Sequence, residues 1–162
     1  MGDVPFRRRG FTLVEILIVV IIIGVLAAIV IPVVSNAQEQ ARQAEFQDTL
    51  RKLTMATQHY LETNSSLPTQ GAGDPIPAEV YVNMYDNATF PNRTPLGGYW
   101  HLGFFADVNE WGVGVWWPSD ETGVEDKIVE IDVALDDGDK NNGKFQARNS
   151  ARYYWLLRKR GN

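Results

Sequence analysis

The residues with the clearest chemical potential lie near the N-terminus, where one carboxylate sits inside an apolar stretch. Gly10 separates three arginines from this stretch, and Glu15 lies five residues after Gly10. A charged carboxylate at the centre of a membrane-spanning helix costs about 2.5 to 3.5 kcal/mol and normally has a partner. Cleavage between Gly10 and Phe11 would create an α-amine one helical turn from Glu15. Glu15 therefore either reaches the membrane surface or pairs with such an amine.

A second candidate for chemistry is the acidic segment 136–143. Asp137, Asp139 and Asn141 alternate along it as oxygen ligands do in calcium-binding loops. The glycine of the segment comes one position later than in such loops, however, and no glutamate closes it. The sequence allows either a calcium site formed by these three residues or a solvated acidic turn.

The stretch that holds Glu15 is long enough to cross a bilayer. It runs from Phe11 to Val34, and 24 residues in a helix cover the roughly 30 Å hydrocarbon core. The arginines at 7–9 precede it, so the positive-inside rule predicts a cytoplasmic N-terminus and an extracytoplasmic remainder. Gly24 and Pro32 are common in transmembrane helices, but they also weaken the helix locally.

Two simpler kinds of N-terminal segment share the arginines and the apolar run. A secretory signal peptide could be cut after Ala37, but its apolar region is usually uncharged and about 7 to 15 residues long. A permanent single-pass anchor would give the residues from Gly10 to Leu13 no role.

The run Gly10-Phe11-Thr12-Leu13-Val14-Glu15 resembles the cleavage and N-methylation motif of type IV pilins and type II secretion pseudopilins. The resemblance continues through Gly24 and Pro32 and covers roughly the first third of the chain. It implies cleavage after Gly10 by a prepilin peptidase, methylation of Phe11, and assembly in which Glu15 meets the terminal amine of a neighbouring subunit. It also implies that the segment from Gly24 to Pro32 extends when subunits pack. The C-terminal disulfide loop of many family members is missing, because the chain contains no cysteine.

These residues must be positioned by a long helix. Beyond Val34, apolar residues recur at spacings of three and four, which predicts an amphipathic helix that ends near Glu62, before a run of turn-forming residues. The predicted organisation is a leader at 1–10, a membrane or filament-core helix at 11–34, its amphipathic continuation at 35–62, and a globular β-rich head at 63–162.

The head is predicted to contain an antiparallel sheet. Aromatic and β-branched runs separated by Gly, Asn, Asp and Pro indicate strands at 99–105, 111–117, 128–133 and 153–157. Residues 128–135 could equally form a short helix before the acidic segment. Packing of the sheet on the amphipathic helix would give an α+β, pilin-like fold.

Composition limits the functions that remain. Residues 1–10 contain three of the 15 basic and one of the 20 acidic residues, so the rest carries a formal charge of −7, which disfavours nonspecific nucleic-acid binding. The chain has two histidines, no cysteine and no motif of a hydrolase, phosphate loop or zinc protease, so no enzyme is expected.

The sequence thus predicts a filament subunit held in the inner membrane and partnered by prepilin peptidase and other pilin-like subunits. The alternative is a permanently anchored protein whose five tryptophans bind a ligand such as a carbohydrate. A type IV pilus, a secretion pseudopilus and a DNA-uptake fibre all remain open.

Overall fold

The computed structural model describes residues 10–82, 90–105, 110–118, 124–149 and 151–157. These residues belong to two units, Met1–Gln40 and Ala41–Asn162. The elements in chain order are α1 (Leu13–Thr63), the short 3-10 helix η1 (Ala78–Val80), β1 (Tyr99–Phe105), β2 (Glu110–Trp116), α2 (Val124–Leu135), β3 (Phe145–Asn149) and β4 (Arg152–Leu157).

The long helix predicted from the sequence is confirmed as α1. It continues through Pro32, and it ends at Thr63, next to the predicted end at Glu62. In the first unit the large apolar side chains of α1 are exposed on all sides, from 83% exposure at Phe11 to 46% at Val34. A helix that is apolar all round needs a nonaqueous or protein environment.

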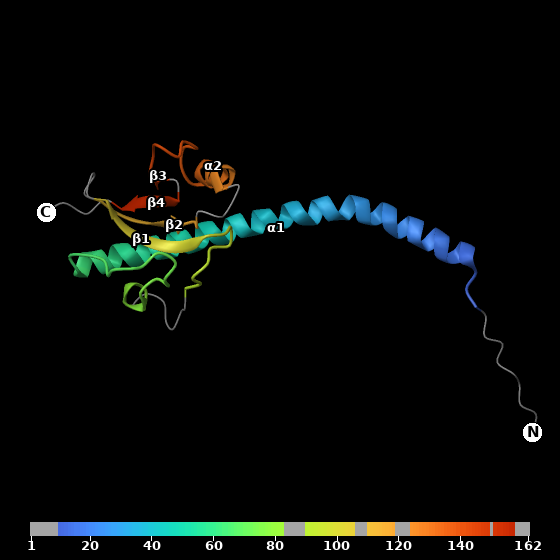
Figure 1. The fold of residues 1–162 in the computed structure, drawn as a ribbon, viewed down its shortest axis with the longest axis horizontal. Helices are drawn as coiled ribbons and strands as arrows, with labels where there is room; N and C mark the ends of the chain where they lie inside the picture. The colour runs from blue at the N-terminus through green and yellow to red at the C-terminus, as the bar shows by residue number, and fades with distance from the viewer. Residues whose placement is uncertain (1–9, 83–89, 106–109, 119–123, 150, 158–162) are drawn as a thin grey trace, which may run out of the picture. The chain divides into compact units, whose positions relative to one another are not determined.

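In the second unit, α1 packs on the sheet through its amphipathic face. Phe46, Leu50 and Leu53 are at most 2% exposed, and the Phe46 ring stacks on Trp100 of β1 with 4.9 Å between ring centres. Figure 1 shows the green end of α1 running beside β1 and β2. This helix–sheet contact confirms the predicted α+β architecture.

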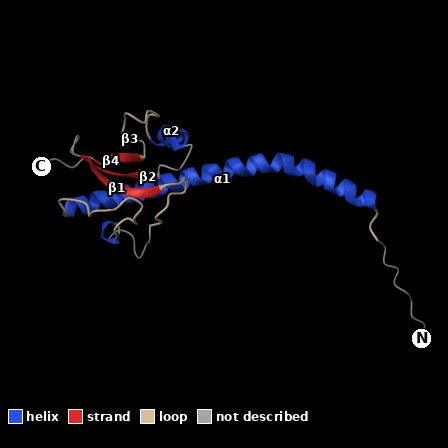
Figure 2. Cartoon of the chain, in the orientation of Figure 1, coloured by secondary structure: helices blue, strands red, loops and turns tan. Residues whose placement is uncertain are grey.

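All four strands are antiparallel, in the order β1-β2-β4-β3 (Figure 2). Successive side chains alternate between the two faces of the sheet. The inner face carries the core residues of β1, β2 and β4, including Leu102, Val113 and Leu157. The outer face carries His101, Gly114 and other residues of the opposite phase.

One predicted strand is wrong, and one observed strand was not predicted. Residues 128–133 lie in α2, so the helical alternative for this segment is correct. Ile128 and Ile131, three residues apart, are both buried in the core, which a helix achieves and a strand does not. The fourth strand is instead β3, Phe145–Asn149, which pairs with β4.

Both edges of the sheet are occupied by atoms of the chain itself. The Gln70 side chain donates to the Trp100 carbonyl at 3.0 Å and accepts from the Leu102 amide at 2.8 Å, as a neighbouring strand would on β1. On β3 the Ala147 amide donates to the Lys140 carbonyl at 2.6 Å. Covered edges reduce strand-to-strand aggregation.

Candidate functional site

The start of α1 is a capping box formed by Thr12 and Glu15. The Glu15 carboxylate accepts the Thr12 amide at 2.7 Å and the Thr12 hydroxyl at 2.8 Å, while the Glu15 amide donates to that hydroxyl at 3.2 Å. Such reciprocal bonds satisfy helix-terminal donors and set the first residue of a helix. The role of Thr12 was not predicted from the sequence, although the spacing Thr-x-x-Glu before an apolar run is the signal for it.

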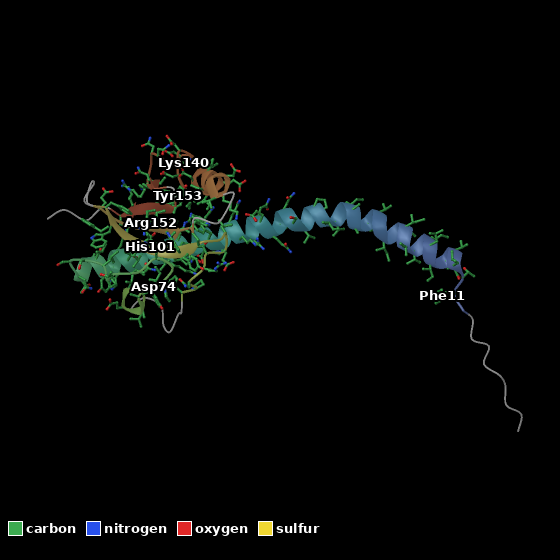
Figure 3. All side chains as sticks on the ribbon, viewed as in Figure 1. Phe11, Asp74, His101, Lys140, Arg152 and Tyr153 are labelled. Atoms are coloured by element: carbon green, nitrogen blue, oxygen red, sulfur yellow. The ribbon has the colours of Figure 1, made fainter. Side chains whose placement is uncertain are left out.

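The predicted cleavage site lies immediately before this box. Gly10 and Phe11 precede the first residue of α1, and both are exposed (Figure 3). A side-chain carbon added at Gly10 would meet nothing within 4 Å. The peptide bond between the two residues is therefore accessible in the described part of the chain, whereas residues 1–9 of the predicted leader lie outside it.

The apolar half of α1 is the one helix among the described residues that is long and apolar enough to cross a membrane. Gly24 lies within it, and a side-chain carbon added there would also meet nothing within 4 Å. Contacts within this subunit therefore do not require a glycine at position 24. Pro32 is helical, so the structure has this segment in its continuous form.

The acidic segment folds as a turn between α2 and β3, and we call residues 136–143 the acidic turn. The Asp139 amide donates to Asp137 Oδ1 at 2.9 Å, and the Asn141 amide donates to Asp139 Oδ1 at 3.0 Å. The Asn141 side-chain nitrogen also points to Asp139 Oδ1, at 3.4 Å. Asp139 and Asn141 are thus engaged with the turn itself.

The structure brings Asp137 together with Asp132 and Asp136 instead. One carboxylate oxygen from each lies within 4.8 Å of the others. Oxygen ligands bind calcium at 2.3–2.6 Å, so two of them lie at most about 5 Å apart, and the spacing fits. Asp136 additionally accepts the amides of Lys144 and Phe145.

Asp132, on α2, is the unusual member of this group. Its side chain is fully buried, and neither oxygen has a hydrogen-bond partner among the described residues. Burial raises the pKa of Asp132 to about 6, and the neighbouring carboxylates of Asp137, Asp136 and Asp139 act in the same direction. An unpaired buried carboxylate is costly unless a proton or a cation neutralises it. Asp132 was not predicted from the sequence because it lies in α2 and not in the turn.

The tryptophans support the core. Trp100 and Trp117 are at most 1% exposed, and Trp111, Trp116 and Trp155 are partly buried. Rings in these positions pack the head, so the arrangement gives no support to a surface that stacks on sugars.

The two histidines occupy unrelated environments. His59 is exposed on α1, whereas His101 is buried on the outer face of the sheet, where its Nδ1 lies 2.7 Å from the Tyr154 hydroxyl. Burial lowers the pKa of His101 to about 4, and the positive charge of Arg152 lowers it as well. His101 is therefore neutral at pH 7 and accepts the Tyr154 hydrogen bond.

Comparison with known proteins identifies the N-terminal segment. Residues 5–31 match the family model of the prokaryotic N-terminal methylation motif. The chain is 34% identical over 93 residues to type II secretion system core protein G of Klebsiella pneumoniae, covering 57% of this chain and 64% of that protein. It is 39% identical over 95 residues to the Dickeya chrysanthemi protein of the same name, covering 57% and 58% of the two chains.

A type IV pilin is also similar. The type IV major pilin protein PilA of Myxococcus xanthus is 46% identical over 54 residues, covering 33% of this chain and 24% of the pilin. The matches to the secretion relatives above cover less than two thirds of those proteins' own length. No solved structure matches the chain.

Proposed function

We propose that this chain, which carries the methylation motif and has secretion core protein G and pilin relatives, is a pilin-like structural subunit of a membrane-assembled filament. The observation that carries the proposal is the arrangement at the start of α1. An exposed Gly10–Phe11 bond precedes a capped helix whose apolar surface is exposed over its whole circumference. In the subunit this surface faces lipid, and in a filament it faces other copies of the helix.

In this proposal residues 1–10 are a leader removed by prepilin peptidase. The cut leaves Phe11 as an N-methylated terminus, 11–34 as the filament core, 35–62 as its amphipathic continuation, and 63–162 as the head. Before assembly the chain is stored in the inner membrane, with its N-terminus cytoplasmic because arginines precede the apolar helix. Gly24 and Pro32 let the helix between them extend as subunits pack.

Glu15 connects one subunit to the next. The capping box uses Thr12 and not Phe11, so it survives cleavage and leaves the new Phe11 amine without a bond to its own Glu15. A neighbouring subunit shifted along the filament can supply a carboxylate to that amine. Pairing across subunits offsets the cost of two charges in a low-dielectric layer and favours one axial stagger.

The relatives favour a secretion pseudopilus over the other filament classes. The secretion core proteins match 57% of this chain, including part of the head, whereas the pilin matches 33%. A permanently anchored ligand-binding protein is the rival function. The burial of the tryptophans removes the main observation that supported that rival.

Calcium at the acidic turn is a second part of the proposal, and the buried Asp132 carboxylate is the observation that favours it. The sequence-predicted ligands were Asp137, Asp139 and Asn141, and the geometry favours Asp132 and Asp136 beside Asp137. When bound, calcium would neutralise Asp132 and join the end of α2 to the turn. Melting of the full chain in micelles should rise with millimolar calcium relative to chelator, because a ligand that binds the folded state stabilises it. Asp132→Asn should abolish the rise, and an equal rise in that variant would contradict the assignment.

Processing and assembly test the main proposal together. The chain is made in cells with and without prepilin peptidase, and sheared filaments and membranes are analysed by intact-mass spectrometry. The expected mature terminus is methylated Phe11, present only with the peptidase and recovered in filaments. Replacing Gly10 with leucine is the matched control and should leave the leader in place. An uncut parent chain, or a terminus at Gln38, would eliminate the proposal.

A further inference from the structure

The outer face of the sheet carries arginines on a floor of aromatic rings. The Arg93 guanidinium lies 5.0 Å from the centre of the Tyr99 ring, and the Arg148 guanidinium lies 4.7 Å from the centre of the Phe105 ring. Arg152 lies opposite Trp116 in the β2–β4 register, and it is labelled beside His101 in Figure 3. We call Arg93, Arg148 and Arg152 the arginine face.

The rings of this face support the arginines and are not themselves free platforms. Tyr99 lies between Arg93 and Trp116, whose ring centre is 5.5 Å away. The Trp116 ring is approached by Gly73, where an added side-chain carbon would come within 3.3 Å of it. A guanidinium stacked on a ring keeps its N–H donors in the ring-parallel plane, which suits the bidentate binding of carboxylates.

The same chain presents the complementary chemistry at the acidic turn. Asp136, Asp137 and Asp139 lie there, where α2 ends and β3 begins, and Asp137 and Asp139 point their carboxylates at the turn's surface. Glu110 is the acidic residue in register with Phe105 on the sheet, so positive charge prevails among the described residues on its outer face. Complementary charge steers association and selects the partner surface.

We propose that the arginine face of one copy binds the acidic turn of a second copy. The inference rests on the proposed filament function, which brings copies close together. The two surfaces are different patches, so the contact is heterologous, and contacts of this type propagate instead of closing into a pair. An extended polyanion fits the face less well, because the chain as a whole is acidic, with a formal charge of −5.

The absence of cysteine gives a direct test. Two tagged copies are produced in the same cells with prepilin peptidase, one with Arg93→Cys and the other with Asp139→Cys. A disulfide between tags then reports contact between the arginine face and the acidic turn. The matched control pairs Arg93→Cys with Asp48→Cys, because Asp48 is an acidic residue on α1 whose side chain is 62% exposed. The expected result is several-fold more crosslinked heterodimer from the 93/139 pair than from the 93/48 pair.

Charge reversal provides a second readout. Arg93→Glu and Asp139→Arg should each reduce this contact and the yield of sheared filaments, and their combination should restore both. Equal crosslinking of the two cysteine pairs, in cells whose filaments contain both copies, would overturn the inference and leave the proposed function intact. Failure of the parent to form filaments would overturn the proposed function, while crosslinks in the membrane fraction would still decide whether the two surfaces meet. Retention of the parent on an acidic polysaccharide, lost in Arg93→Glu and without crosslinks, would assign the face to that partner instead.

Discussion

Acid should destabilise the head through His101, and the size of the effect follows from its surroundings. His101, Gly114 and Tyr154 lie opposite one another on β1, β2 and β4. Gly114 has no side chain, so the Tyr154 hydroxyl can reach across β2 to His101 Nδ1 at 2.7 Å. Protonation of Nδ1 would remove the acceptor of this bond and place a charge beside Arg152.

The sign follows from proton binding in the two states. The pKa of His101 is lowered from its ordinary 6.5 to about 4, chiefly by burial. Between these values the unfolded chain binds the proton more tightly, so stability that is present at pH 7 is lost as the pH falls from about 6.5 to about 4. At about 1.4 kcal/mol for each pKa unit, the loss is about 3 kcal/mol.

The test compares the parent with His101→Asn at several pH values. Asparagine can accept the Tyr154 hydrogen bond but does not titrate, and it leaves the other ionisable groups unchanged. Urea unfolding of the full chain in micelles, followed by tryptophan fluorescence, gives the free energy of unfolding at pH 7 and pH 4. The parent should lose about 3 kcal/mol more than the variant over this range.

The matched control is His59→Asn, which removes the exposed histidine on α1. It should retain the acid sensitivity of the parent. If His101→Asn instead loses the same free energy as the parent between pH 7 and pH 4, then a neutral, buried His101 is not the source of acid sensitivity, and this reasoning is refuted.

Three further changes test other features of the molecule. Glu15→Gln should still insert and be cut after Gly10 but enter filaments poorly, because it removes the charge that pairs with a neighbouring amine; normal filament yield at equal expression would mean that Glu15 only reaches the membrane surface. Gly114→Ala should destabilise the head by at least about 3 kcal/mol in urea unfolding, because the added carbon would come within 2.6 Å of the Tyr154 Cα and still closer to the Tyr153 carbonyl. Gln70→Ala should increase aggregation of the chain in light scattering, because it uncovers the edge of β1, and unchanged scattering would show that the edge is protected by other means.

The N-terminal third could be predicted because its information is local. A leader glycine, a carboxylate one turn into the helix and an apolar run are neighbours in the chain, so spacing alone indicates the cleavage site and the long helix. The strands β1, β2 and β4 were predictable for a similar reason, because aromatic and β-branched runs between turn residues favour strands.

The residues of α2 and β3 show where local pattern is insufficient. Residues 128–133 alternate apolar and acidic side chains as a strand does, yet their apolar positions also fit a helix. The core decides between them, because a helix buries both Ile128 and Ile131. Phe145–Asn149 has a weak strand pattern, and pairing with β4 fixes it as the fourth strand.

The sequence by itself determined the long apolar helix, the Gly10–Phe11 junction and the position of Glu15, because each depends on residues within a few turns of one another. Only the tertiary structure decided that Asp132 joins Asp136 and Asp137, since the folding of α2 orients a buried carboxylate toward the turn. It also decided that Tyr154 reaches His101, since that contact joins residues 53 positions apart. Strand order and helix packing create such contacts, and spacing along the chain does not encode them.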